Sequence, residues 1–207
     1  MNVVHLITSI DKGGAENHLA SLIKGLQNKN NKIYVIYLKG NGFWKKYYSK
    51  LGIKVINLSN INGNFIGTYK KIKFLVNFYK IHKIDIVHAH LPHMEIYGFL
   101  SLILSSKKIR FFITKHLDNN IIGGSNYKYN SFIASFINNI IFLKANKIIT
   151  ISNSVKKFFL RDIFKVNSDK FKLIYYGINK DYIKLLHNKK YFNKKLSLKN
   201  KLIFGSL

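Results

Sequence analysis

The sequence contains no cysteine, a single proline and no uninterrupted run of the roughly 20 apolar residues that cross a bilayer. Without cysteine, the chain forms no disulfide, no thiolate metal site and no cysteine nucleophile. The first residues, Met1 to Thr8, lack the basic start, the long apolar stretch and the small-residue cleavage site of a signal peptide. The expected compartment is therefore the cytoplasm.

Acidic residues are also scarce, because 8 Asp and Glu stand against 35 Lys and Arg, which leaves a net charge of +27. Such a surplus is typical of proteins that bind nucleic acid or an anionic membrane. Arginine occurs only at Arg110 and Arg161, however, and no RNA-binding or DNA-binding module is recognisable. Specific nucleic-acid binding is therefore not expected. Lys, Asn and Ile are the residues of A/T-rich codons, so the charge has two open explanations, codon composition and a selected basic surface.

Apolar residues make up 47% of the chain, enough for a sizeable core. Short apolar runs, typical of strands buried on both faces of a parallel sheet, are residues 3–7, 33–38, 55–58, 84–87, 110–114, 147–151 and 171–175. Between them, runs with helical spacing are residues 15–27, 65–81, 95–104, 132–143 and 155–164. This alternation predicts an α/β fold: a doubly wound, parallel-sheet, Rossmann-like domain with right-handed crossovers.

The composition changes near the C-terminal end of the chain. Residues 188–201 are rich in Lys and Asn and poor in apolar residues, whereas residues 202–207 begin with another apolar run. We therefore expect a domain over residues 1–187, a polar linker over 188–201 and the first strand of a further domain over 202–207.

In doubly wound sheets, ligands bind at the carboxyl ends of the strands, next to the point where the strand order reverses. The first predicted strand is followed by Gly13 and Gly14 and then by a helix. Paired glycines let the backbone approach a ligand, and a helix N-terminus favours an anion such as a diphosphate. Neither a Gly-x-Gly-x-x-Gly motif nor a P-loop is present, so a plain turn with a helix cap is the alternative.

Histidines follow two other predicted strands. His88 and His90 alternate with Ala89 and therefore share one face of a strand, where a metal site is conceivable. With so few acidic residues we expect no metal, but one packed histidine and one that reaches the cleft. His116 follows the next strand and can hold, polarise or exchange a proton with a sugar hydroxyl, although a structural histidine is the alternative.

Together these strand ends resemble the N-terminal domain of a family 4 glycosyltransferase, whose GT-B fold has two facing Rossmann-like domains. The resemblance covers essentially the whole chain, from Asn2 to Leu207. Its carriers are Gly-Gly-Ala-Glu at 13–16, Asp-Ile-Val-His-Ala-His at 85–90, Thr-Lys-His at 114–116, Ile-Thr-Ile-Ser-Asn-Ser at 149–154 and Tyr-Gly-Ile-Asn at 176–179.

The resemblance implies transfer of a sugar from a nucleotide-sugar with retention of anomeric configuration and without a metal or another cofactor. It implies donor contact for Gly13 and Gly14 and a catalytic position for His116, beside the transferred sugar. Positions that it implies for the acceptor or the cleft lining are Glu16, His90, Ser152 and Asn153. For Glu16 and Ser152 helix capping is an alternative, because a carboxylate or hydroxyl at a helix start is stabilising in itself.

Two departures from the family pattern matter. Asn179 stands where many relatives have Asp, which puts an acid role at that turn in doubt. The family's Glu-x7-Glu motif belongs to the second domain, and the chain has only two glutamates, Glu16 and Glu95. We therefore expect these 207 residues to be inactive alone and to act within a longer hexosyltransferase.

The expected partners are a nucleotide-sugar donor and a glycan or lipid-linked acceptor in cell-envelope polysaccharide, glycolipid or lipopolysaccharide synthesis. Residues 43–48 and 69–83 combine lysines with aromatic side chains, which favours peripheral contact with an anionic membrane surface on the inner face of the cell membrane. Ordinary amphipathic segments with solvated lysines are the alternative. The alternative for the whole chain is a non-catalytic binding module or a polyanion-binding basic domain.

Overall fold

The computed structural model describes residues 1–27, 31–61, 65–118, 131–161 and 163–177. The chain divides into two compact units, Met1–Tyr176 and Gly177–Leu207, and the described helices and strands all belong to the first. The predicted linker at 188–201 and the predicted strand at 202–207 lie outside the described residues.

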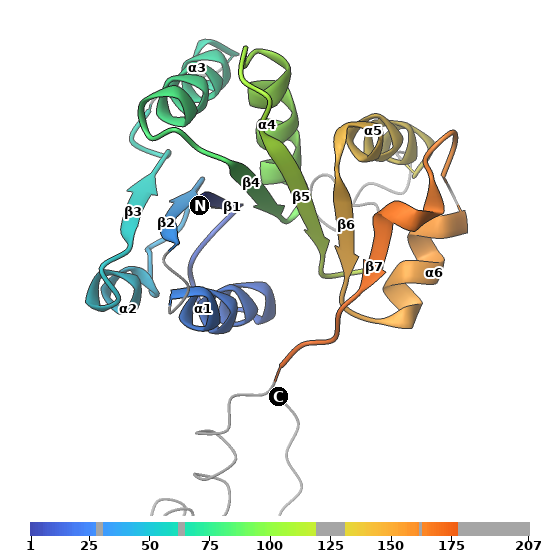
Figure 1. Ribbon diagram of the computed structural model, residues 1–207, viewed down its shortest axis with the longest axis horizontal. Helices are drawn as coiled ribbons and strands as arrows, with labels where there is room; N and C mark the ends of the chain where they lie inside the picture. The colour runs from blue at the N-terminus through green and yellow to red at the C-terminus, as the bar shows by residue number, and fades with distance from the viewer. Residues whose placement is uncertain (28–30, 62–64, 119–130, 162, 178–207) are drawn as a thin grey trace, which may run out of the picture. The chain divides into compact units, whose positions relative to one another are not determined.

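The first unit is built on one seven-stranded sheet in which all neighbouring strands are parallel (Figure 1). The strands are β1 (Asn2–Ile7), β2 (Lys32–Tyr37), β3 (Lys54–Asn57), β4 (Ile86–His90), β5 (Arg110–Lys115), β6 (Lys147–Thr150) and β7 (Phe171–Leu173). Their order is β3-β2-β1-β4-β5-β6-β7, so the strand order reverses between β1 and β4. The predicted doubly wound α/β fold is confirmed.

Helices cover both faces of the sheet, as a parallel sheet requires. They are α1 (Gly14–Leu26), α2 (Lys45–Lys50), α3 (Phe65–Ile81), α4 (Pro92–Ile103), α5 (Ser131–Lys144) and α6 (Asn153–Arg161), with a short 3₁₀ turn, η3 (Ser168–Lys170), before β7. Side chains of α1 and α2 pack into one apolar core, whereas those of α3, α4, α5 and α6 pack into a second. In Figure 1, α1 and α2 accordingly lie on the opposite side of the sheet from α3 and α4.

Most predicted elements match the observed ones within a few residues, with two exceptions. The fourth strand was predicted to end at Val87, but β4 continues to His90, because its two histidines are buried like the apolar residues around them. The second exception is α2, which no helical pattern predicted. It carries Tyr48 fully into the core beside α1, so this aromatic ring is not available for membrane contact.

Candidate functional site

Three histidines meet where the strand order reverses. His5 of β1 is paired in register with His88 of β4, and His90 lies two residues further along β4 on the same face. One ring nitrogen from each of the three lies within 4.8 Å of those of the other two. All three side chains are buried, so the expectation that one of the β4 histidines reaches the cleft is wrong.

Burial keeps these histidines neutral. It lowers the pKa of His5 to about 3, with a smaller contribution from the charge of His18. Burial, and then the neighbouring histidines, hold the pKa values of His88 and His90 well below the ordinary 6.5. A second proton on any of these rings would place an unsolvated charge in the core, so the cluster is uncharged at neutral pH.

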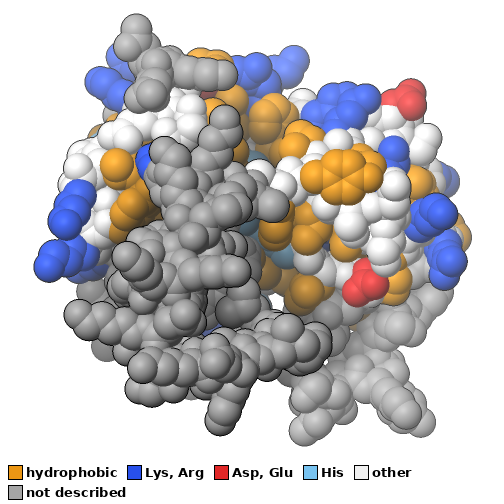
Figure 2. Space-filling view, turned by 90° about the horizontal axis from the view of Figure 1, so that it is seen from below, with side chains coloured by type: hydrophobic (Ala, Val, Ile, Leu, Met, Phe, Trp, Pro, Cys, Tyr) orange, Lys and Arg blue, Asp and Glu red, His pale blue; other side chains and the backbone are white. Residues whose placement is uncertain are grey.

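The cluster continues toward the surface through His116, which directly follows β5. His5 Nδ1 lies 3.3 Å from His90 Nε2, and His90 Nδ1 lies 3.2 Å from His116 Nε2. His116 Nδ1 in turn is hydrogen-bonded to the hydroxyl of Tyr176, just beyond β7. Figure 2 shows pale-blue histidine side chains near the middle of the face that it views, with lysine and arginine gathered toward the margins.

His116 is the outermost histidine of this series and the predicted catalytic residue. Its side chain retains 8% exposure. Burial lowers its pKa to about 3, and the charges of His18 and Lys115 act in the same direction. A neutral imidazole with this pKa fits a hydrogen-bonding or polarising role toward a sugar hydroxyl better than a role as proton reservoir at neutral pH.

Tyr176 and His18 belong to this site, although neither was predicted for it. The ring of His18, on α1, stacks on that of Tyr176 with centroids 4.1 Å apart and an interplanar angle of 18°. His18 is four residues after Gly14 and therefore lies one helical turn along α1. The spacing from Gly14 could have indicated that His18 lies near the site. The Tyr176 ring on which it stacks, however, comes from the other end of the domain's sequence.

The predicted diglycine loop lies at the same edge of the sheet as His116, beyond the carboxyl ends of the strands. Gly13 has an extended backbone and precedes α1, Gly14 begins the helix, and both are exposed. A Cβ atom at Gly13 would collide with the carboxylate of Glu16, whereas one at Gly14 would meet nothing within 4 Å. The buried Glu16 accepts a hydrogen bond of 2.6 Å from the Ser9 hydroxyl, which holds its carboxylate against the loop. The first turn of α1 thus combines exposed backbone at Gly13 and Gly14, which favours an anion, with the carboxylate of Glu16, which already lies against this loop.

Ser152 and Asn153 lie at the start of α6 rather than among the histidines. The Ser152 hydroxyl accepts a hydrogen bond of 3.2 Å from the Val155 backbone N–H, which is the capping role given above as its alternative. Asn153 is exposed and donates to the Tyr175 hydroxyl over 3.4 Å.

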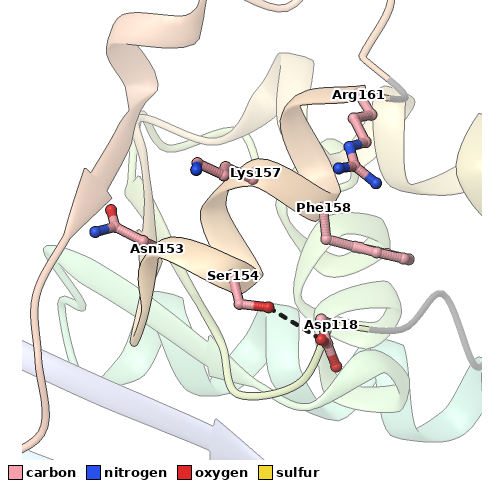
Figure 3. A pocket seen from close by; sticks show the side chains of 6 residues that line it. All are labelled: Asp118, Asn153, Ser154, Lys157, Phe158 and Arg161. Atoms are coloured by element: carbon pink, nitrogen blue, oxygen red, sulfur yellow. Dashed lines mark hydrogen bonds between the residues drawn. The ribbon is translucent and has the colours of Figure 1, made fainter.

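Asn153 helps to line a surface cavity of about 420 Å³. The other lining residues are Asp118, Ser154, Lys157, Phe158 and Arg161. Figure 3 shows Asp118 facing Ser154, whose hydroxyl donates to the Asp118 carboxylate over 3.2 Å. The cavity does not include the histidines, so the predicted site residues fall into two groups, one around His116 and one at the start of α6.

A buried ion pair supports the site from the opposite face of the sheet. Lys115 alternates with His116 and therefore points the other way, where its Nζ lies 2.6 Å from a carboxylate oxygen of Glu95 on α4. Lys115 also donates to Asn138 of α5 and lies over the rings of Phe142 and Phe159. The two charged side chains are only 4% and 1% exposed. The pair thus ties β5 to the helices behind it.

Among the described residues, His5, His88 and His90 are those that could hold a metal. Neutral imidazoles suit a transition metal, but in this structure both nitrogens of His90, Nδ1 of His5 and Nε2 of His88 are already hydrogen-bonded. No carboxylate belongs to this cluster of described residues. A reaction without metal or cofactor stays a prediction.

Comparisons with known proteins agree with the fold. Comparison with curated protein sequences gave no match. Among solved structures, a glycosyltransferase from Rickettsia africae ESF-5 has a TM-score of 0.71 at 20% identity, covering 97% of this chain and 50% of that one. UDP-GlcNAc 2-epimerase from Neisseria meningitidis, bound to UDP-GlcNAc, scores 0.67 at 15% identity, covering 97% and 55%. The lipopolysaccharide outer core galactosyltransferase WaaB scores 0.64 at 16% identity, covering 86% and 46%.

At these identities the structures establish a shared fold, and this chain spans about half the length of each of the three proteins. The family assignment comes from the sequence itself. The model of Glycosyltransferase Family 4 matches residues 12–182, which include the diglycine loop, all of β4 and β5, and Tyr176. The match covers far more than half of the chain. The chain belongs to glycosyltransferase family 4.

Proposed function

We propose that this chain is the acceptor-side half of a retaining hexosyltransferase that uses a nucleotide-sugar donor. The observation that carries the proposal is the hydrogen-bonded pair His116 and Tyr176, next to the exposed start of α1 at Gly13 and Gly14. Neutral hydrogen-bonding groups suit sugar hydroxyls, and a helix N-terminus suits a diphosphate without requiring a metal.

The roles follow from this arrangement. His116 lies beside the transferred sugar and acts on it through the hydroxyl of Tyr176, because both ring nitrogens of His116 are already hydrogen-bonded, to His90 and to Tyr176. Gly13 and Gly14 give the donor diphosphate access to backbone N–H groups. Asn153 belongs to the acceptor side, because it lines the cavity at the start of α6. That cavity also holds Lys157 and Arg161, which would attract a phosphorylated or otherwise anionic acceptor. His90 has no exposed surface and acts through His116.

The proposed pathway is cell-envelope polysaccharide, glycolipid or lipopolysaccharide synthesis. WaaB, a galactosyltransferase of the lipopolysaccharide outer core, shares the fold and supports an acceptor of this kind. A lipid-linked acceptor also agrees with the surplus of lysine, which would hold the enzyme at an anionic bilayer.

A transfer assay tests the proposed function. The protein encoded by the complete reading frame is incubated with radiolabelled UDP- and GDP-hexoses and a lipid extract of its own cells. We expect label to enter one lipid or glycan product in the presence of EDTA, and NMR of that product should show the anomeric configuration of the donor. Inverted configuration would contradict retention, and epimerised nucleotide-sugar without any transfer would contradict the transferase function.

The proposed membrane surface is the outer face of α3 together with α5. Helix α3 exposes Tyr69 at 60% and carries exposed lysines, among them Lys70 and Lys73. Helix α5 exposes four apolar side chains on one stripe, which were not predicted as a membrane surface: Ile133, Phe136, Ile140 and Leu143. Both helices pack against α4, so they belong to one face of the domain. No described helix is long and apolar enough to span a bilayer.

Vesicle co-sedimentation tests this surface. We expect the chain to bind vesicles containing anionic lipid more tightly than neutral ones, and Phe136→Ser to lower that affinity roughly 5-fold, because an aromatic side chain no longer enters the interface. Phe43→Ser is the matched control: Phe43 is also exposed, but it precedes α2, which packs on the opposite face of the sheet from α3, so this variant should change the affinity little. A similar loss for Phe43→Ser would assign membrane contact to the predicted segment at residues 43–48 as well. Equal binding to neutral and anionic vesicles would contradict the electrostatic part of the proposal.

A further inference from the structure

We propose that His5, His90 and His116 form a chain of hydrogen bonds with one fixed direction, which leaves the Tyr176 hydroxyl proton free to bond an oxygen of a nucleotide-sugar. The direction of the chain is independent of the proposed function, which enters only through the identity of the ligand. Tyr176 thereby becomes a ligand-binding residue, and His5 and His90 become positioning residues that act through His116.

The direction follows from the chemistry of neutral imidazole, which has one N–H donor and one acceptor nitrogen. His90 sits between two other imidazoles, so one of its nitrogens must donate and the other must accept. Once the proton of one ring is fixed, those of the other two are fixed as well. The whole chain therefore has two states, with the protons pointing either inward to His5 or outward to Tyr176.

The buried end selects between these states. His5 has no exposed surface, and its Nε2 atom has no hydrogen-bond partner among the described residues. In the inward state His5 Nδ1 accepts from His90, so the His5 proton must sit on Nε2 as a buried N–H without a partner. In the outward state only a lone pair is left unpaired at Nε2. A buried unpaired donor costs about 1–3 kcal/mol and is rarer in proteins than an unpaired acceptor, so the outward state is favoured.

At the outer end, the outward state makes His116 Nδ1–H a donor to the Tyr176 oxygen. The Tyr176 proton must then point elsewhere, and the described residues provide no other hydrogen-bond partner for this hydroxyl. Burial, and then the charge of Glu16, raise the pKa of Tyr176 to about 12, so the phenol keeps its proton at neutral pH. Stacking on His18 fixes the ring. A directed donor therefore stands beside His116, at the edge where the ligand is proposed to bind.

NMR of histidine tautomers tests the direction without any assay of activity. The 207-residue chain is labelled with ¹⁵N-histidine, and the imidazole ¹⁵N shifts and two-bond couplings are recorded at pH 7. The outward state predicts that His5, His90 and His116 all carry their proton on Nδ1. A proton on Nε2 of any of the three would overturn the proposal.

Ligand titration tests the role of Tyr176. The protein encoded by the complete reading frame is titrated, as wild type and as Tyr176→Phe, with UDP and, separately, with glucose, so that a phosphate oxygen and a sugar hydroxyl are distinguished. Loss of one neutral hydrogen bond, worth about 1 kcal/mol, predicts roughly 5-fold weaker binding of the ligand that reaches the hydroxyl. Tyr69→Phe is the matched control, because Tyr69 is exposed on α3, away from the site, and this variant should bind like wild type.

Two further outcomes distinguish the donor role of Tyr176 from the proposed function. Equal affinities of wild type and Tyr176→Phe for both ligands would overturn the donor role of Tyr176. Failure of UDP and of glucose to bind either protein would count against the proposed function, and the tautomers would still decide the direction of the chain.

Discussion

Lys115→Met should destabilise the domain by about 3–5 kcal/mol, because it leaves the Glu95 carboxylate buried without its cationic partner. Burial already raises the pKa of Glu95 above its ordinary value, and Lys115 is what lowers it again. The other oxygen of Glu95, Oε1, has no hydrogen-bond partner among the described residues, so nothing described would replace the lysine. For a domain of this size the loss corresponds to a fall of about 6–20 °C in Tm.

Urea unfolding of three variants measures this effect. The exposed Lys172 is the matched control, and Lys172→Met should stay within about 0.5 kcal/mol of wild type. The double variant Lys115→Met/Glu95→Leu should recover a large part of the loss, because an apolar pair carries no unpaired charge. An unfolding midpoint of Lys115→Met equal to that of wild type would contradict the structural role of the pair.

Acid should unfold the domain well above the pH at which carboxylates titrate. The pKa values of His5 and His116 are about 3 in the folded state, and those of His88 and His90 are also lowered well below 6.5 by burial. The unfolded chain therefore binds more protons below pH 6.5. The stability that these four histidines contribute is fully present above that pH and is lost as the pH falls.

The expected loss between pH 7 and pH 5 is on the order of 5 kcal/mol, a large share of the stability of an ordinary domain. The raised pKa of Glu95 acts in the opposite direction, but it is a single group. Urea unfolding at half-unit steps of pH gives the slope of the free energy of unfolding against pH. As the pH falls, this slope should come to correspond to several protons taken up per molecule unfolded. A free energy of unfolding that is constant from pH 7 to pH 5 would show that the histidines are not held neutral.

The seven strands could be predicted because strands buried on both faces of a parallel sheet are nearly continuous apolar runs. The same rule misplaced the end of β4, since His88 and His90 are buried although they are polar. Helix α2 was missed because six residues are too few to show helical spacing. Its aromatic residues therefore suggested a surface segment, yet Tyr48 lies fully in the core.

The site was predictable only where polar residues follow strands. His116 and the diglycine loop were found in this way, and their placement at one edge follows from the fold. His5 lies in the middle of an apolar run, and only the register of β1 against β4 brings it to His88. Tyr176 meets His116 across 60 positions of the chain, which no local pattern indicates. The burial of Lys115 could have been predicted, because a lysine that alternates with His116 must point to the opposite, helix-covered face of the sheet.

The turnover of a histidine variant measures whether His116 acts on the sugar, through Tyr176, in a transferase. In the protein encoded by the complete reading frame, His116→Ala should lower sugar transfer about 100-fold, because it releases the Tyr176 hydroxyl and so removes one preorganised hydrogen-bond donor. His82→Ala is the matched control, because His82 lies at the opposite end of the sheet from the site. Its backbone carbonyl there accepts a hydrogen bond from the Asn2 side chain. We expect about a 100-fold loss for the first variant and wild-type turnover for the second. Wild-type turnover by a folded His116→Ala protein would contradict this role of His116.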